Sequence, residues 1–85
     1  MSAAVELGTG GQSTTFPTWV GAGTTTLWVQ NLGDSNAGRV SVNAGAHGET
    51  VDVGPGASTS IERQWGGVQI GVTNTGQTSV KVWTA

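Results

Sequence analysis

The only histidine of the chain, His47, is the first residue to test for catalytic chemistry. It stands in the stretch AGAHGE, with Glu49 and Asp52 shortly after it. A Ser-His-acid triad needs a nucleophile hydrogen-bonded to the histidine inside a shaped cleft, and no spacing in this sequence indicates such an arrangement. We interpret His47 as a solvated turn residue, and we expect no catalytic residue and no enzyme activity.

Carboxylate pairs and metal ligands are equally sparse. A glycosidase needs two carboxylates that face each other across a groove, and no spacing singles out a pair among the five Asp and Glu residues. Zinc favours several His or Cys ligands, whereas the chain has one His and no Cys. Asp34 and Asn36 of GDSNAG could serve calcium, but one carboxylate is a poor charge count and an Asx turn explains the loop equally well. We predict no metal and no cofactor.

Tryptophan is the residue type whose placement needs an explanation, because the chain has four of them. Successive side chains of a strand point to opposite faces. In TTLWVQ the Leu and Val are expected to point inward, which leaves Trp28 on the outer face with Gln30. In SVKVWT the two middle valines are expected to point inward, which leaves Trp83 outward beside Lys81. Two indoles are therefore predicted on the face that the pattern assigns to solvent.

Something is expected to cover these two outward indoles. An enclosed aromatic side chain removes roughly 150–250 Å² from water, worth several kcal/mol at about 25 cal/mol per Å². Three coverings stay open: a strand bulge or folded-back N-terminal arm of the same chain, a subunit interface, or a ligand. In the third case an indole stacks on the apolar face of a sugar ring, while neighbouring neutral side chains supply hydrogen bonds.

The other aromatic residues fall in predicted loops. In FPTW, Phe16 and Trp19 are expected to plug one end of the core, with Pro17 favouring an extended approach. Trp65 in RQWGG (63–67) is expected to close the core at a hairpin corner, and to join the ligand site only if its loop folds over the face of Trp28 and Trp83. The stretch QWGG also resembles one repeated in a family of tandem-repeat, mannose-binding bacterial and algal lectins. The likeness spans four of the 85 residues and the tandem repeat is missing, so no site residue is carried over.

The elements that must position these side chains have the pattern of β-strands. Segments rich in Val and Thr alternate apolar and polar residues, with Gly, Asn and Asp turns between them. In GVQIGV this parity places Val68 inward together with the following Ile and Val. We predict six or seven strands, over residues 3–7, 25–30, 38–43, 49–53, 58–63, 67–72 and 79–84.

These elements predict an all-β fold in one domain, residues 1–85. The expected architecture is a small antiparallel β-sandwich, immunoglobulin-like or jelly-roll-like, or a compact barrel. LWVQNLG…GRVSV and VQIGVTNTG…SVKV share a strand, an Asn-x-Gly turn and a second strand, which we interpret as two hairpins. The stretch VDVGPGASTSI between them resembles the PG turn that links middle strands of immunoglobulin-like sandwiches. A flexible arm rich in Gly, Ser and Thr is predicted at residues 8–15.

The composition of the chain narrows the classes of partner that it is expected to bind. Three basic residues, a net charge of −2 and the absence of an apolar span make nucleic acid and membrane insertion unexpected. The first residues lack the basic and apolar regions of a signal peptide, and no compartment is predicted. A chain of 85 residues has little core to offset the entropy of folding, so we expect a homo-oligomer.

Together these observations predict a non-catalytic, lectin-like module. It would bind a glycan or another neutral polar ligand as an oligomer, through Trp28, Trp83, Gln30 and Lys81, with Trp65 as a further candidate. The alternative is a structural role, as a self-assembling surface or capsid-decorating protein. That alternative rests on the arm at residues 8–15, which could dock on a neighbouring chain.

Overall fold

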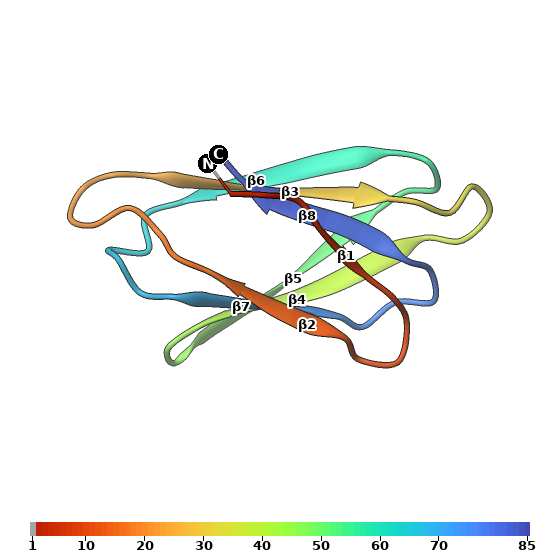
Figure 1. Cartoon of the computed structure of the whole chain (residues 1–85), viewed down its shortest axis with the longest axis horizontal. Coiled ribbons are helices and arrows are strands. Elements are labelled where there is room, and N and C mark those ends of the chain that lie inside the picture. The colour runs from red at the N-terminus through yellow and green to blue at the C-terminus, as the bar shows by residue number, and fades with distance from the viewer. Residues whose placement is uncertain (1) are drawn as a thin grey trace.

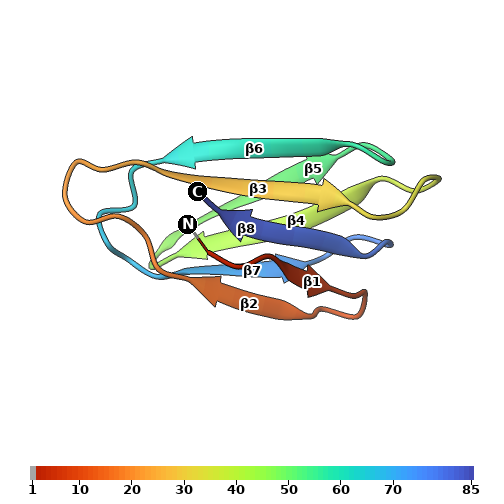
Figure 2. The same ribbon diagram turned by 45° about the horizontal axis from the view of Figure 1, so that its top comes forward.

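The computed structural model describes residues 2–85 and is all-β, as predicted. Eight strands form two antiparallel sheets of four, with the order β1-β8-β3-β6 in sheet A and β2-β7-β4-β5 in sheet B. The strands are β1 (Val5–Leu7), β2 (Ser13–Phe16), β3 (Thr25–Asn31), β4 (Gly38–Ala44), β5 (His47–Val53), β6 (Ser58–Arg63), β7 (Ile70–Asn74) and β8 (Val80–Thr84). The two sheets lie face to face as a small β-sandwich (Figures 1 and 2).

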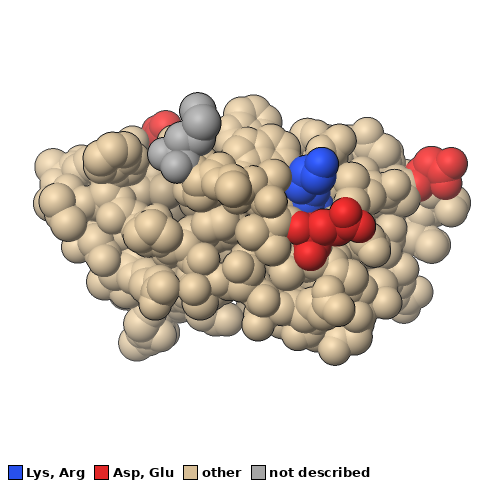
Figure 3. Space-filling view, in the orientation of Figure 1, with Lys and Arg blue, Asp and Glu red and all other residues tan. Residues whose placement is uncertain are grey.

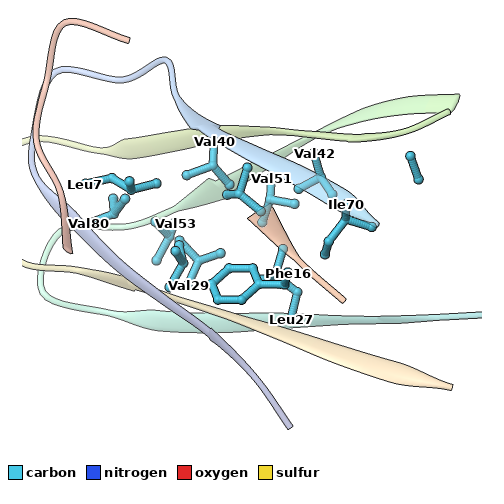
Figure 4. Packing of buried hydrophobic residues seen from close by; sticks show 13 residues of the cluster. Leu7, Phe16, Leu27, Val29, Val40, Val42, Val51, Val53, Ile70 and Val80 are labelled. Atoms are coloured by element: carbon cyan, nitrogen blue, oxygen red, sulfur yellow. The ribbon is translucent and has the colours of Figure 1, made fainter. Parts of the chain in front are cut away.

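The core lies between the sheets and is made by the alternation read from the sequence. In β3 every second residue is buried, from Thr25 to Asn31, and β4, β7 and β8 alternate in the same way. Figure 4 shows Leu27 and Val29 of sheet A facing Val40, Val42 and Ile70 of sheet B, with Phe16 between the two layers. Leu27, Val29, Ile70 and Val82 are 0% exposed, so the central strands contribute the best-buried side chains.

Two parts of the strand prediction are wrong. The structure has eight strands, because Ser13–Phe16 forms β2 beside β7; residues 13–15 of the predicted arm (8–15) are therefore paired strand. Residues 8–12 of that segment lie outside strands. In addition, β7 begins at Ile70 and not at residue 67, and Val68 is 46% exposed where parity placed it inward. The loop after β6 extends to residue 69, so the alternation of a strand does not apply to residues 67–69.

The predicted hairpins are sheet-to-sheet crossings. β3 belongs to sheet A and β4 to sheet B, while β7 belongs to sheet B and β8 to sheet A, so neither Asn-x-Gly turn joins paired strands. RQWGG likewise leads from β6 in sheet A to β7 in sheet B, and is not a hairpin corner. Its two glycines have positive φ values of 63° and 84°, which explains why this turn uses glycine.

The two halves of the chain follow the same path. Exchange β1 with β5, β2 with β6, β3 with β7 and β4 with β8. The order of sheet A, β1-β8-β3-β6, then becomes β5-β4-β7-β2, which is the order of sheet B read from its other edge. The registers agree as well: Leu27 in β3 pairs with Ile61, and Ile70 in β7 pairs with Phe16. The sandwich is therefore pseudo-two-fold symmetric, with the axis running along the strands between the sheets. Every strand pairing in residues 2–85 joins one half to the other.

The two crossings, which we call the Asn arches, repeat this symmetry in detail. Asn31 and Asn74 end β3 and β7 and are 2% and 1% exposed. The Asn31 Nδ2 group donates to the carbonyl oxygens of Asn36 (2.7 Å) and Val53 (3.3 Å), and its Oδ1 accepts from the Gly33 amide (2.8 Å). Asn74 makes the same set, donating to Leu7 (3.0 Å) and Thr78 (2.9 Å) and accepting from Gly76 (3.0 Å). Each asparagine thus satisfies both its amide and its carbonyl group where the chain leaves one sheet for the other.

Candidate functional site

The two outward tryptophans form a pair on the outer face of sheet A. Trp28 in β3 and Trp83 in β8 are directly opposed in the antiparallel register. Their ring centroids are 6.1 Å apart and their planes differ by 8°, so the indoles stand nearly parallel. This spacing is in the range that aromatic pairs prefer and is worth about 0.5–1.5 kcal/mol beyond burial. Both side chains are half-buried, because each ring partly covers the other.

Gln30 and Lys81 lie next to this pair on the same face. They are opposed to each other, two residues away from the tryptophans in the same two strands, and both are half-buried. Together with Trp83 they line a hollow of about 280 Å³ whose far wall is formed by Ser2, Ala4 and Ala85. Four of the five predicted site residues, Trp28, Trp83, Gln30 and Lys81, are therefore neighbours. We call this set the Trp platform.

The segment before β1 lies beside the end of β8 and lines the hollow next to Trp83. The Ser2 amide donates to the Thr84 carbonyl oxygen (3.0 Å), and the Thr84 amide donates to the Ser2 hydroxyl oxygen (2.8 Å). These bonds hold Ser2 beside the end of β8. Ser2 and Ala4 thus line the hollow together with Trp83, and the hollow itself stays open.

The pseudo-two-fold axis provides an internal comparison for the platform. The residues equivalent to Trp28 and Trp83 on sheet B are Gly71 and Asn43, which are opposed in the same way. The residues equivalent to Gln30 and Lys81 are Thr73 and Ser41, which also oppose each other. The same strand framework is thus built without any aromatic residue on the outer face of sheet B. The indole pair of sheet A is therefore a feature that the equivalent face of sheet B lacks.

Trp65 does not join the platform. It packs against the core from the loop between β6 and β7 and is half-buried, in agreement with a closing role at one end. Beside it lies a hollow of about 480 Å³, lined also by His47, Glu49 and Arg63. The Arg63 Nη2 donates to Glu49 Oε1 at 3.0 Å across the open edge between β6 and β5. Trp65 therefore belongs to a separate, partly charged surface.

The prediction for FPTW is half correct. Phe16 is 3% exposed and lies in the core, whereas Trp19 is 56% exposed and plugs nothing. Phe16 ends β2 and points between the sheets, but Trp19 stands in the loop that follows. Parity could not foresee this difference, since it applies only within a strand.

The protein has few charged side chains, three basic and five acidic. Arg39 donates from Nε to Asp52 Oδ1 at 2.7 Å, between β4 and β5. This hydrogen bond, together with the carboxylate charge, raises the pKa of Arg39 above its usual value. Within residues 2–85 no group of three His, Cys, Asp or Glu side chains is placed to hold a metal ion. Figure 3 shows how few charged side chains this side of the molecule carries.

The fold and the platform define a small two-sheet β-sandwich that presents a tryptophan pair on one face. The chain belongs to a family of unknown function, DUF8244, whose model matches residues 5–85. Two uncharacterized proteins of Dictyostelium discoideum are similar to it, at 45% and 42% identity over 70 residues, covering 82% of this chain and 82% of each relative. No solved structure matches the chain. Family membership assigns no activity, so a function has to be argued from the surface.

Proposed function

We propose that the protein is a non-catalytic, lectin-like module that binds a neutral sugar on the Trp platform and acts as an oligomer. The observation that carries this proposal is the difference between the two outer faces. A pseudo-symmetric framework places Gly71 and Asn43 on sheet B where sheet A has Trp28 and Trp83. An indole pair that the equivalent face lacks is best explained by what it contacts outside the monomer.

The chemistry of the platform suits a polyhydroxylated ring. The exposed part of each indole offers a flat apolar surface to the C–H face of a pyranose. The Gln30 amide can both donate and accept hydrogen bonds, and the Lys81 ammonium can donate to a hydroxyl oxygen. The hollow of about 280 Å³ is slightly smaller than typical ligand pockets, which have about 300–1,000 Å³. It has room for a single sugar ring, so each site is expected to be weak.

Oligomer formation would compensate for that weakness. Linking several weak sites raises the overall affinity by up to orders of magnitude without any new contact. The long edge strands β5 and β6, of seven and six residues, have backbone groups on their free sides that another copy could use. Light scattering gives the mass in solution, and a monomer at micromolar concentration would remove this part of the proposal.

The proposal is tested by a glycan array, followed by fluorescence titration of the best sugar with Trp28→Ala and Trp83→Ala. If a sugar covers about a third of an indole of roughly 150–250 Å², the lost burial is about 1.3–2 kcal/mol, a loss of about ten- to thirtyfold in affinity. Trp→Phe at either position should restore part of the binding. Ser41→Ala and Thr73→Ala, at the places on sheet B that are equivalent to Lys81 and Gln30, serve as controls and should leave the affinity unchanged. Failure to bind any neutral glycan at millimolar concentration refutes the proposal.

A further inference from the structure

The hollow beside Trp65, which we call the Trp65 hollow, lies at the side of the sandwich where two edge strands meet. β5 and β6 are the edge strands of sheets B and A on that side (Figure 2). The volume of about 480 Å³ falls in the range of about 300–1,000 Å³ that is typical of small-molecule sites. Four apolar side chains contribute to its wall: Val42 and Ala44 of β4, and Trp65 and Val68 of the loop after β6.

Two charged side chains line this hollow from core-facing positions of the edge strands. Glu49 lies on the same face of β5 as the buried Val51, and it is opposed to the buried Val42 of β4. Arg63 is opposed to the buried Thr25 of β3, which places it on the inner face of sheet A. Both side chains are therefore directed toward the space between the sheets at its open side.

The pseudo-two-fold axis shows that the position of Glu49 can hold an apolar residue. The pair Val42–Glu49 in sheet B is equivalent to the pair Val82–Val5 in sheet A. Val5 is partly buried and packs against the core. Glu49 is thus a carboxylate at a core-facing position where the other half of the chain has a valine.

The two charged side chains bind each other and keep capacity for further hydrogen bonds. Arg63 Nη2 donates to Glu49 Oε1 at 3.0 Å, and Arg63 Nη1 donates to the Glu62 carbonyl oxygen at 2.8 Å. The side chains of Arg63 and Glu49 are 48% and 35% exposed. A guanidinium has five N–H donors and a carboxylate has about four acceptor positions. Both members of the pair can therefore bind a further molecule from the hollow.

The ion pair restricts the class of ligand that can cover it. A ligand with a single charge is attracted by one member of the pair and repelled by the other. A neutral apolar ligand would remove both charges from water and offer no hydrogen bond in return. A zwitterion with adjacent ammonium and carboxylate groups instead offers each member its opposite charge and forms charge-assisted hydrogen bonds with both.

A second ion pair shows what the Trp65 hollow adds. Arg39 and Asp52, which are 2.7 Å apart, line another hollow of about 320 Å³. The other residues around that hollow are small or polar: Asn36, Ala37, Gly38, Thr75, Gly76 and Gln77. It therefore offers the two charges without an apolar wall. The Trp65 hollow combines an ion pair with an indole and aliphatic side chains, which favours a zwitterion that also carries an apolar group.

From these features we infer that the Trp65 hollow binds a free α-amino acid with an aliphatic or aromatic side chain. The carboxylate of the ligand lies on Arg63, its ammonium group lies on Glu49, and its side chain contacts Trp65. His47 and Gln64 line the same hollow and offer further hydrogen bonds. This site is separate from the Trp platform on the outer face of sheet A, so it does not depend on sugar binding.

Calorimetric titration of the wild-type chain tests the required charges with three probes of the same shape. L-Phenylalanine is compared with phenethylamine, which lacks the carboxylate, and with hydrocinnamate, which lacks the ammonium group. Each of these two is expected to bind at least about tenfold more weakly, because one charge-assisted contact is lost and one repulsion remains. Glycine, which lacks the apolar group, is also expected to bind more weakly. Equal affinity for phenylalanine and either single-charge probe, or no binding of phenylalanine at millimolar concentration, overturns the inference.

Variants of the ion pair locate the site. Glu49→Gln and Arg63→Gln should each weaken phenylalanine binding by at least about tenfold. Glu49→Gln should also strengthen the binding of hydrocinnamate, since the repulsion of its carboxylate is removed; a purely structural role of Glu49 does not predict this gain. Arg39→Gln is the matched control from the second ion pair, and circular dichroism checks that the variants fold.

The controls also separate this site from the Trp platform. Phenylalanine should bind to Arg39→Gln and to Trp28→Ala as it does to the wild type. A loss in Arg39→Gln would place the amino-acid site at the second ion pair, and a loss in Trp28→Ala would place it on the Trp platform. Either result contradicts the inference, whereas failure of sugar binding with normal phenylalanine binding contradicts only the proposed function.

Discussion

Replacement of the buried asparagines gives the most direct test of the pseudo-symmetric fold. Asn31→Ala and Asn74→Ala each remove three hydrogen bonds from an Asn arch. At a net value of about 0.5–1.5 kcal/mol for each bond, the loss is about 1.5–4.5 kcal/mol. A domain of 85 residues has a total stability of about 4–13 kcal/mol, so either variant should fold with a clearly lower urea midpoint. Because the two arches make equivalent bonds, the two losses should agree within about 1 kcal/mol.

Urea unfolding followed by tryptophan fluorescence measures both losses. Asn36→Ala is the matched control, because this residue is exposed and enters the network only through its backbone carbonyl oxygen; its midpoint should stay at the wild-type value. Asn74→Asp keeps the Oδ1 acceptor but loses both donors and buries a carboxylate, so it should be at least as destabilising as Asn74→Ala. Losses below about 0.5 kcal/mol in both alanine variants would show that water replaces the side chain, and the reasoning would fail.

Three further predictions concern packing and the surface. Gly76→Ala should destabilise by about 1–3 kcal/mol, since its Cβ would lie 2.7 Å from the Arg39 amide nitrogen; Gly71→Ala, with nothing within 4 Å, should be neutral or stabilising in the same urea assay. Leu27→Ala, at 0% exposure, should lower the free energy of unfolding by about 2–5 kcal/mol, and an effect below 1 would contradict the core assignment. Arg39→Ala should hardly move the urea midpoint at neutral pH, because the ion pair with Asp52 is exposed. The raised pKa of Arg39 implies a stabilisation that is lost only at strongly alkaline pH, so stability profiles of wild type and variant should run parallel around neutrality.

The sequence predicted the fold class because alternation is a local signal. The parity in β3 and β8 depends only on neighbouring residues, and it correctly placed Trp28 and Trp83 outward and the valines beside them inward. It also brought Gln30 and Lys81 to the same face. What it could not supply was the pairing of β3 with β8, which makes these four residues neighbours although more than 50 positions separate Trp28 from Trp83.

The errors arose where the chain changes sheets. An Asn-x-Gly turn between two strands predicts a hairpin when only local geometry is considered. Here the asparagine side chain is buried and bonds to a distant carbonyl oxygen, that of Val53 or Leu7, so the turn directs the chain to the opposite layer. The repeated Asn-x-Gly motif was visible in the sequence. Its meaning depended on burial, which no sequence pattern of this length reveals.

The exchange of strands between the two halves has a consequence for how the molecule is made. Since every pairing in residues 2–85 joins β1–β4 to β5–β8, the first half of the chain has no native partner while it leaves the ribosome. The β4–β5 hairpin, with its short turn at Gly45, is the one pairing between consecutive strands, and is therefore the earliest native structure that can form. The other pairings close longer loops, which slows folding. Each half acts as the template on which the other becomes ordered, and no smaller piece of the sandwich is expected to be stable alone.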